Sequence, residues 1–576
     1  MHTVTVPRHR GRTLFGGLQV SPILLLIITV ALLGLLFLVC LPMYRLIAFS
    51  LSDVDTGDFT LGNYREAFSH RRYFDAYLTT MLLGCTSVFL AALWALPMAW
   101  VIARTNMPGK NLVYVLVLCT FVVPPYLGAI SWILLAGENA GWINVIAQKF
   151  FGVGSVVNIF SFWGLSFVIS LYSFPFVFIM TRSALFSISS EIEEAASILG
   201  SGPLKTARRI TLPLVLPAIL AGCIVTYLEA ISLYGSPSFL ALPARLGVVT
   251  TQLWEFFNPP TRAEAAAAYS MPLVLMAIVL FLIQSWITKR KSYVSVTGKG
   301  GRHQLIDLGA FRWVAFLYCL VVLSMSFILP ALVLSQAAFS RAWGLGMSVA
   351  NFTFGNFKYV LFEHSTVPGA ILNTFVYSAL AGVLAVIIGG LCGTLVVRRL
   401  VPGAALIAGI CMTPFVVPGI VLGIGFYAAY TTPPLNLYGT SMILIFAFAA
   451  RFLPIAFLGS SAAIRSVNPE MEEAAQILGA SRGLIIRKIL LPITKASLAS
   501  AWLLIFISAT RELSTAIFLS SSSTRVMSIM LFDLSEEGNL EYLSALGIVM
   551  IAITIALIVV GKLSFGREFL MGKGTS

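Results

Sequence analysis

Charged residues are scarce in this sequence. Asp, Glu, Lys and Arg make up 10% of its 576 residues, against roughly 25% in soluble proteins. Hydrophobic residues make up 58%, and the mean hydropathy is +0.93. This composition excludes a soluble globular protein and indicates an integral membrane protein.

Histidine and cysteine are also few, and neither is spaced as metal ligands are. The histidines lie scattered in tails and loops: His2, His9, His70, His303 and His364. The cysteines fall within long apolar runs, where they are typical small packing residues: Cys40, Cys85, Cys119, Cys223, Cys319, Cys392 and Cys411. There is no disulfide framework and no zinc pattern. A histidine-based metal site is therefore not expected, and the sequence assigns no metal ligand.

A nucleotide-binding P-loop is absent as well. Neither GxxxxGKS nor GxxxxGKT occurs, and the nearest string, GSGPLKT at 200–206, has Leu204 where the second glycine belongs. We therefore expect no enzymatic activity and no cofactor on this chain.

What the sequence does contain is long apolar runs. A helix needs about 20 residues to cross the hydrocarbon core of a bilayer. Twelve runs are long enough: 22–43, 77–103, 112–136, 157–181, 214–234, 268–288, 313–339, 370–397, 404–430, 438–460, 493–520 and 543–563. We therefore predict an all-α integral membrane protein with twelve transmembrane helices.

Basic residues are distributed unevenly around these runs. With the N-terminus in the cytoplasm, 25 of the 37 Lys and Arg residues lie inside, among them Arg8, Arg10 and Arg12, and 10 lie outside. This asymmetry follows the positive-inside rule. The first run is too long for a signal peptide and lacks a small-residue cleavage site, so we expect a retained span. The net charge of +14 then reflects topology and requires no nucleic-acid partner.

The chain is an internal duplication. FTLGNY returns as FTFGNF, and FVVP at 121–124 returns at 415–418. Residues 191–213 and 470–492 are identical at 12 of 23 positions. Each half holds six predicted spans, an even number, so both halves enter the membrane in the same sense. We predict two parallel six-helix repeats, related by an axis along the membrane normal.

Two short acidic segments belong to this repeat, EIEEAASILG at 191–200 and EMEEAAQILG at 470–479. Ser189 or Ser190 can cap the first, and Asn468 can cap the second. Their glutamates fall in the first turn, where they complement the positive end of the helix dipole. Each predicts a helix of about ten residues, half the length of a span.

Each of these helices is expected to end at a glycine. Gly200 and Gly479 stand where a left-handed residue stops a helix. Because the helices are too short to span, we place them in the cytoplasm, where they present alanines and acids to a partner. Ordinary solvated loop helices are the alternative, but these loops match better between the two halves than most of the spans around them.

At this point the sequence resembles a known family. EAASILGSGPLKTARRITLP and EAAQILGASRGLIIRKILLP look like the EAA loop of the permease subunits of bacterial ABC importers. In that loop EAA is followed by three residues, Gly, nine residues, Ile, any residue and Leu-Pro, and both copies match in full. The resemblance covers essentially the whole chain and implies the fold of a type I ABC importer permease. The two halves are fused, as in ferric-iron and thiamine permeases.

The resemblance implies two coupling helices, each seated on one cytosolic ATPase subunit. Carried over position by position, the ATPase-coupling residues are Glu191, Glu194, Ala195, Ala196, Gly200, Glu470, Glu473, Ala474, Ala475 and Gly479. ATP and Mg²⁺ would bind to that partner, and a periplasmic binding protein would deliver the substrate. The half-bundles would then open alternately to either side of the bacterial inner membrane.

The same resemblance implies a division of the chain into five segments. They are a cytoplasmic N-terminal tail at 1–21, a first permease half at 22–288, a cytoplasmic linker at 289–312, a second permease half at 313–563 and a cytoplasmic C-terminal tail at 564–576.

Charges inside spans cost roughly 2.5–3.5 kcal/mol on insertion scales, so they are candidates for function. The pathway candidates are Tyr227, Glu229, Arg511 and Glu512. A structural pair is the alternative for Arg511 and Glu512. Neighbours on a helix point about 100° apart, so each should have its own partner. Arg451 is interpreted as a packing or snorkelling residue. Carboxylate and phenolate oxygens suit a hard cation.

The substrate is less constrained than the class of transporter. The linker string VTGKGGR and the string RELSTAIFL resemble ferric-iron permeases. Thiamine, polyamine, phosphonate and sugar-phosphate permeases share the EAA loop and stay open as alternatives. A secondary transporter fits the number of spans but gives no reason for the duplicated loops. A membrane scaffold explains neither the loops nor the buried charges.

Overall fold

The computed structural model describes residues 12–13, 19–20, 22–53, 56–188, 190–290, 305–346, 348–433 and 435–565. Most of the predicted tails and the linker up to residue 304 lie outside these ranges, as do Arg8, Arg10 and Ser189. The first described residues form two antiparallel strands of two residues each, β1 (Arg12–Thr13) and β2 (Gln19–Val20). Elsewhere in the described ranges the elements are helices.

The helices of the first half are α1 (Pro22–Leu35), α2 (Leu41–Ser50), α3 (Gly62–Ser69), α4 (Arg71–Arg104), α5 (Lys110–Val122), α6 (Pro125–Ala136), α7 (Trp142–Phe151), α8 (Phe162–Ser187), α9 (Ser190–Ile198), α10 (Pro203–Thr206), α11 (Leu212–Ser232), α12 (Gly235–Leu240), α13 (Val249–Glu255) and α14 (Ala263–Arg290).

The helices of the second half are α15 (Phe311–Leu323), α16 (Leu329–Ala338), α17 (Gly355–Lys358), α18 (Val367–Val397), α19 (Ala404–Val416), α20 (Gly419–Tyr430), α21 (Ser441–Arg465), α22 (Pro469–Ile477), α23 (Arg482–Ile485), α24 (Leu491–Thr510), α25 (Met527–Glu536) and α26 (Leu540–Phe565). Two short 3₁₀ helices, Trp343–Leu345 and Val349–Asn351, lie between α16 and α17.

Several helices widen into a π-helical turn just before a Leu-Pro pair. These turns are Leu36–Cys40, Ala207–Thr211, Ser324–Ile328 and Ile486–Leu490, and each continues directly into the next α-helix. Proline lacks the N–H that would bond four residues back, and its ring crowds the carbonyl there. A wider turn accommodates the proline without ending the helix.

Ten of the described helices are long and apolar enough to cross a membrane. Two further spans are broken into pairs, α5 with α6 at 99° and α19 with α20 at 111°. With each pair counted as one span, the total is the predicted twelve. Within the predicted runs 112–136 and 404–430, however, the chain forms two helices and not one continuous helix. Both breaks fall at the repeated FVVP, where proline and the extended residue before it stop the helix.

The eleventh predicted span is too long at its C-terminal end. α24 stops at Thr510, so Arg511 and Glu512 lie in the irregular segment after the helix and not inside it. The apolar residues that extended the prediction, such as Leu513 and Leu519, are buried in the protein. Hydropathy alone does not separate burial in protein from exposure to lipid.

The first span of each half packs against the other half. α1 contacts α18, and α15 contacts α4 and α5. Gly34 of α1 lies so close to Ile388 of α18 that an added Cβ would stand 2.4 Å from its Cδ1. Each half therefore packs its first helix against the helices of the other half.

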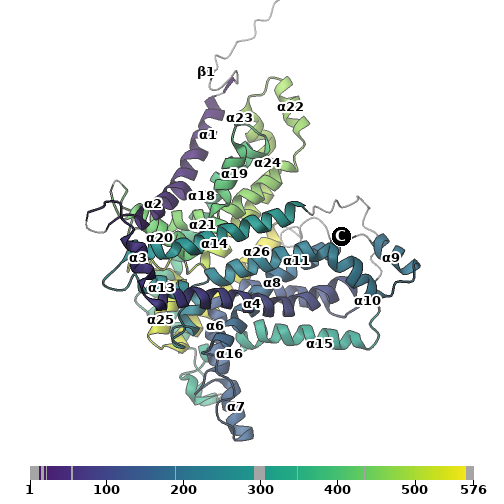
Figure 1. Ribbon diagram of the computed structural model, residues 1–576, viewed down its shortest axis with the longest axis vertical. Helices are drawn as coiled ribbons and strands as arrows, with labels where there is room; N and C mark the ends of the chain where they lie inside the picture. Colours follow the sequence, from purple (N-terminus) through teal and green to yellow (C-terminus); the bar gives the residue numbers. More distant parts are fainter. Residues whose placement is uncertain are drawn as a thin grey trace, which may run out of the picture.

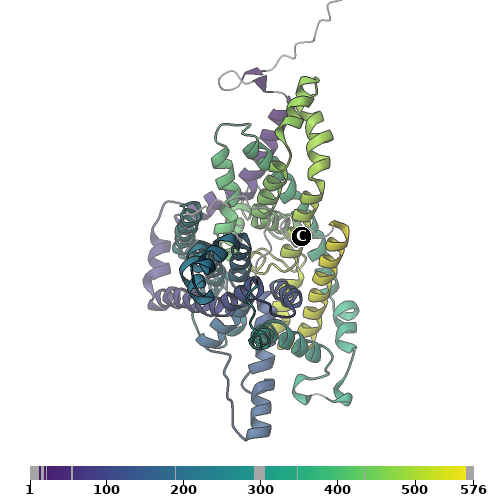
Figure 2. The ribbon, with the colours of Figure 1, turned by 90° about the vertical axis from the view of Figure 1, so that its right-hand side faces the viewer.

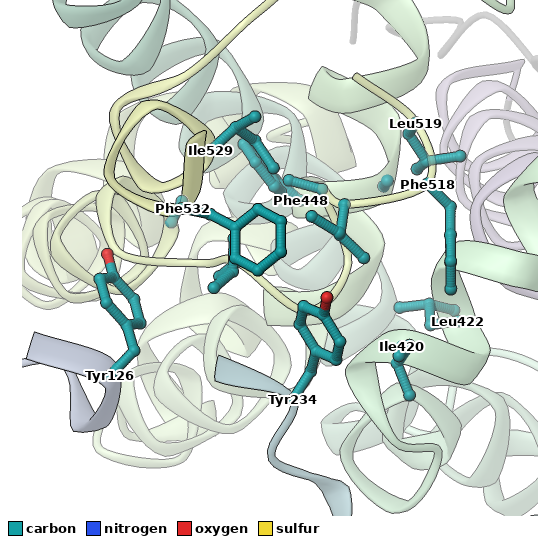
Figure 3. Packing of buried hydrophobic residues seen from close by; sticks show 14 of the residues in the cluster. Tyr126, Tyr234, Ile420, Leu422, Phe448, Phe518, Leu519, Ile529 and Phe532 are labelled. Carbon is teal, nitrogen blue, oxygen red and sulfur yellow. The ribbon is translucent and has the colours of Figure 1, made fainter. Parts of the chain in front are cut away.

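Away from this junction the halves diverge, as Figures 1 and 2 show. In Figure 1, α22 lies at the end of one arm and α9 at the end of another. The two arms meet in an apolar core, seen in Figure 3, to which both halves contribute. There the rings of Tyr234 and Phe532 lie 6.0 Å apart, centroid to centroid. The core fixes the halves at one end and leaves their other ends separate.

The first half carries one long insertion that the second half lacks. FVVP recurs after 294 residues but the acidic segment after 279, so the first half carries 15 extra residues between them. The connection from α6 to α8, residues 137–161, accounts for this difference, because α20 and α21 are joined by residues 431–440 alone. α7 occupies the longer connection and projects from the body in Figure 2.

The described end of the linker forms hydrogen bonds with the end of α4. The Ile306 N–H donates to the Arg104 carbonyl at 2.8 Å, and the Asn106 N–H donates to the Ile306 carbonyl at 3.1 Å. The Asp307 carboxylate accepts hydrogen bonds from Gly309 N–H and the Asn106 amide, which lower its pKa. The second half therefore starts from a fixed point on the first.

Candidate functional sites: two acidic helices and a central cavity

The two acidic segments form the short helices that the sequence predicts. α9 begins at Ser190, and α22 begins at Pro469. The Asn468 side chain accepts a hydrogen bond from the Glu470 N–H at 3.1 Å, which makes it the N-cap. Both helices lie between spans, on the side of the molecule where α4 and α18 end.

The ends of the two helices are also alike. Gly200 has φ +76° and Gly479 has φ +83°, the left-handed conformation expected from the sequence. The Ser201 N–H donates to the Ala196 carbonyl, and the Ala480 N–H donates to the Ala475 carbonyl, both at 2.9 Å. These are the long hydrogen bonds of a Schellman motif.

Each helix ends in an exposed apolar pair that sequence reasoning missed. Ile198 and Leu199 are 86% and 87% exposed, and Ile477 and Leu478 are again 86% and 87% exposed. These loops connect spans, so lipid does not explain the exposure. Large aliphatic side chains this exposed, at matching positions in both halves, form two equivalent apolar surfaces of the kind found at interaction sites.

The predicted coupling residues divide between the outside and the inside of the helices. The exposed ones are Glu191, Ala195, Gly200, Glu470, Glu473, Ala474 and Gly479. Ala196 is buried and Ala475 is half-buried, so these two face the body of the protein. The side chain of Glu194 lies outside the described residues.

Each acidic helix begins with three glutamates, and the second of the three forms an ion pair with an arginine. Arg104 Nη2 lies 3.3 Å from Glu193 Oε1, and Arg398 Nη2 lies 2.6 Å from Glu472 Oε1. Sequence reasoning missed both pairs. The available signal was the arginine at the end of the second span, which recurs after 294 residues, as FVVP does.

A cavity of about 280 Å³ lies where the two halves meet. Both broken spans border it, through Phe121 and Pro125 on one side and residues 414–418 on the other. Its charged lining residues are Glu229, Arg451, Arg511 and Glu512. The structure therefore brings three of the four predicted pathway residues together, and their charges balance when Arg451 is included.

The arginines of the cavity hold the broken ends of the spans. Arg511 Nη1 reaches from the second half to the carbonyls of Phe121 and Val122, at 2.5 and 3.1 Å. Arg451 Nη1 donates to the carbonyls of Pro414 and Val417, at 3.0 and 2.8 Å. A helix C-terminus attracts cations, so each guanidinium compensates carbonyls that the break leaves unpaired.

The two acids of the cavity have different surroundings. Among the described residues, Glu229 lines the cavity together with Arg451 and Arg511 but forms no ion pair of 4.0 Å or less with either of them. Glu512 Oε1 accepts hydrogen bonds from the N–H and the hydroxyl of Thr515, at 2.9 and 3.0 Å. Arg511 and Glu512 therefore have separate partners, as expected, although they do not lie on a helix.

Tyr227 lies elsewhere. Its ring packs against α4, where a Cβ on Gly84 would stand 2.7 Å from Tyr227 Cε2, and it does not line the cavity. In the described ranges no three His, Cys, Asp or Glu side chains form a group that could hold a metal ion. The cavity thus offers two carboxylates and two guanidiniums, and no preformed multi-ligand metal site.

The chain matches one family model twice. The model describes the inner membrane component of binding-protein-dependent transport systems, and it matches residues 89–293 and 385–567. The chain belongs to this family. Each copy of the inner membrane component contains one acidic helix, so the repeat inferred from the sequence is the family's own unit.

Curated relatives of this inner membrane component include ferric transport permeases. A ferric transport system permease protein of Actinobacillus pleuropneumoniae is 26% identical over 486 residues, 83% of this chain and 68% of the relative. A putative one from Haemophilus influenzae is 27% identical over 456 residues, 78% of this chain and 70% of the relative. A molybdenum transport system permease protein of Haemophilus influenzae matches 37% of this chain at 27% identity.

Neutralising the cavity acids is expected to slow transport and leave the protein folded. Glu229→Gln and Glu512→Gln remove charge but hardly any volume, and glutamine still accepts the hydrogen bonds of Thr515. Substrate uptake and thermal unfolding of each variant in proteoliposomes would test this. Glu264→Gln is the matched control, because Glu264 is also half-buried at the start of a span but does not line the cavity. Normal uptake by both variants would exclude these acids from the pathway.

Proposed function

We propose that this chain is the permease of an ATP-driven importer, that α9 and α22 each dock on one cytosolic ATPase subunit, and that the substrate is ferric iron. The exposed Ile-Leu pair that recurs at the end of both helices carries this proposal. Two equal docking sites fit two copies of one partner. The absence of a P-loop from the sequence supports a separate ATPase that binds ATP and Mg²⁺.

The transport path is proposed to run through the central cavity. The cavity lies between the halves and at both helix breaks, where irregular backbone in a membrane protein is tolerated. A periplasmic binding protein would deliver substrate on the side opposite α9 and α22. Movement of these helices toward each other would bring together the two arms seen in Figure 1 and expose the cavity to the other side.

Ferric iron as substrate rests on the names of the two relatives that cover most of the chain. The carboxylates of Glu229 and Glu512 are hard oxygen ligands of the kind that suits such an ion. The molybdenum permease matches a smaller part of the chain, and the family as a whole is not bound to one substrate.

Uptake by proteoliposomes containing the chain, its ATPase and its binding protein tests this function. With radioactive ferric iron loaded on the binding protein, uptake should require ATP and should not respond to a proton or sodium gradient. Excess thiamine, spermidine, phosphonate or sugar phosphate should not compete. Uptake driven by an ion gradient alone would refute the importer. ATP-driven uptake of one of the competitors, without iron, would refute only the substrate.

A further inference from the structure

The acidic helix of the second half has little to hold it in place. None of its residues is buried, so packing contributes little to its position. Glu472 attaches it to the spans, since its Oε1 accepts a hydrogen bond from Arg398 Nε at 2.8 Å. Both side chains are 14% exposed, and the pair is therefore shielded from most solvent and salt.

Arg398 connects more than two elements. It follows the last residue of α18, and its Nη2 donates to the carbonyls of Ile464 and Val467, at 3.1 and 3.0 Å. Those carbonyls lie at the end of α21, where the helix dipole favours a cation. The planar guanidinium fork suits several acceptors at once. One side chain thus joins α22 to the ends of both α18 and α21.

The first half contains a corresponding pair of an arginine and a glutamate of the acidic helix, at a longer distance. Arg104 is the last residue of α4, is 2% exposed and pairs with Glu193 of α9. The Glu193 carboxylate also accepts a hydrogen bond from the Thr211 hydroxyl, at 2.7 Å, just before α11 begins. The arginines recur with the 294-residue offset of FVVP and the glutamates with the 279-residue offset of the acidic helices. The arginine–glutamate pair therefore belongs to the duplicated unit.

We propose that the ion pairs Arg104–Glu193 and Arg398–Glu472 are the joints that make the second span of each half move with its acidic helix. Their four side chains are positioning residues for the transport cycle. This inference rests on the proposed function, since it requires that the ATPases move α9 and α22. Without its ion pair, α22 would pivot at Asn468 and Gly479, and its movement would no longer reach α18.

The test uses the complete complex in proteoliposomes, with Glu472→Gln and Arg398→Gln as single variants. Three quantities are measured: co-purification of the ATPase, ATP hydrolysis stimulated by the loaded binding protein, and substrate molecules transported per ATP. ATPase binding should be unchanged, because the exposed Ile477 and Leu478 remain. Transport per ATP should fall at least roughly tenfold, because a shielded charge that loses its hydrogen-bonded partner is costly.

Four further variants distinguish a mechanical connection between the helices from a contact that only stabilises them. The conservative variant Arg398→Lys, which keeps the positive charge and a donor, should retain part of the transport per ATP. Arg399→Gln is the matched control, because Arg399 is the next residue and is exposed. The first-half variant Glu193→Gln should uncouple in the same way, and the double variant Glu193→Gln with Glu472→Gln should uncouple almost completely.

Each result decides the inference. An unchanged ratio of transport to ATP hydrolysis in the single variants would overturn it. A parallel loss of ATPase binding and transport at a constant ratio would overturn it too, because the pairs would then only stabilise the loops. The inference is supported if the parent chain transports with ATP and the single variants transport less substrate per ATP. A parent chain that binds no ATPase would refute the proposed function, and the joint with it.

Discussion

Replacing Leu199 and Leu478 together with glutamate is expected to abolish co-purification of the ATPase. Both leucines are 87% exposed in the isolated chain. Burying one leucine side chain contributes about 1.5–3 kcal/mol, and a carboxylate at that place must also be desolvated. Because two loops on one particle bind two copies of the partner, the double variant should lose roughly a hundredfold or more relative to either single variant.

The measurement is recovery of the ATPase on the purified permease at several ATPase concentrations. The control replaces the same two leucines with methionine, which keeps volume and apolar character and typically costs under about 1.5 kcal/mol. If the double glutamate variant retains the ATPase like the parent, α9 and α22 are solvated loop helices and the proposed function is wrong.

Replacing Arg511 with methionine is expected to destabilise the protein and stop transport. The substitution removes the hydrogen bonds to the Phe121 and Val122 carbonyls, and with them a direct contact between the halves. It also removes one of the two positive charges from the cavity that Glu229 and Glu512 line. A buried charge that loses its compensation can cost about 3–5 kcal/mol. The yield of folded protein in detergent, its thermal unfolding and substrate uptake would all fall.

A second change tells the two losses apart. In Arg511→Met with Glu229→Gln the unpaired acid is gone, so thermal stability should partly recover while uptake stays low. The hydrogen bonds that Arg451→Met removes lie within the second half, so its effect on the association of the halves should be smaller. A stable, transporting Arg511→Met protein would show that the contact across the halves is dispensable.

Local signals made much of this molecule predictable from its sequence. The twelve apolar runs, the cap at Asn468 and the left-handed glycines depend on a few neighbouring residues, and the structure has them. The breaks at FVVP were also visible as a proline inside a run, but run length outweighed them. The position of Arg511 was missed because hydropathy treats lipid and protein interior alike.

Contacts between distant residues were beyond sequence reasoning. Arg104 and Glu193 are 89 positions apart, and Arg398 and Glu472 are 74 apart. The local sequence around each arginine does not indicate which glutamate it contacts, because the pairing depends on how the spans pack. Tyr227 shows the converse. A polar residue inside a span suggested a pathway, yet its ring fills the space beside Gly84.

The insertion that carries α7 gives the duplicated molecule a direction. Two identical halves would present a surface that looks the same after half a turn, so a partner spanning both could settle in either of two orientations with equal energy. α7 stands on one half alone and exposes Ile146, Phe150 and Phe151 there. Any body that covers both halves on that side meets a protrusion at one end and a ten-residue connection at the other. The fifteen inserted residues therefore remove the twofold equivalence of this surface, so that a partner covering both halves can bind in one orientation only.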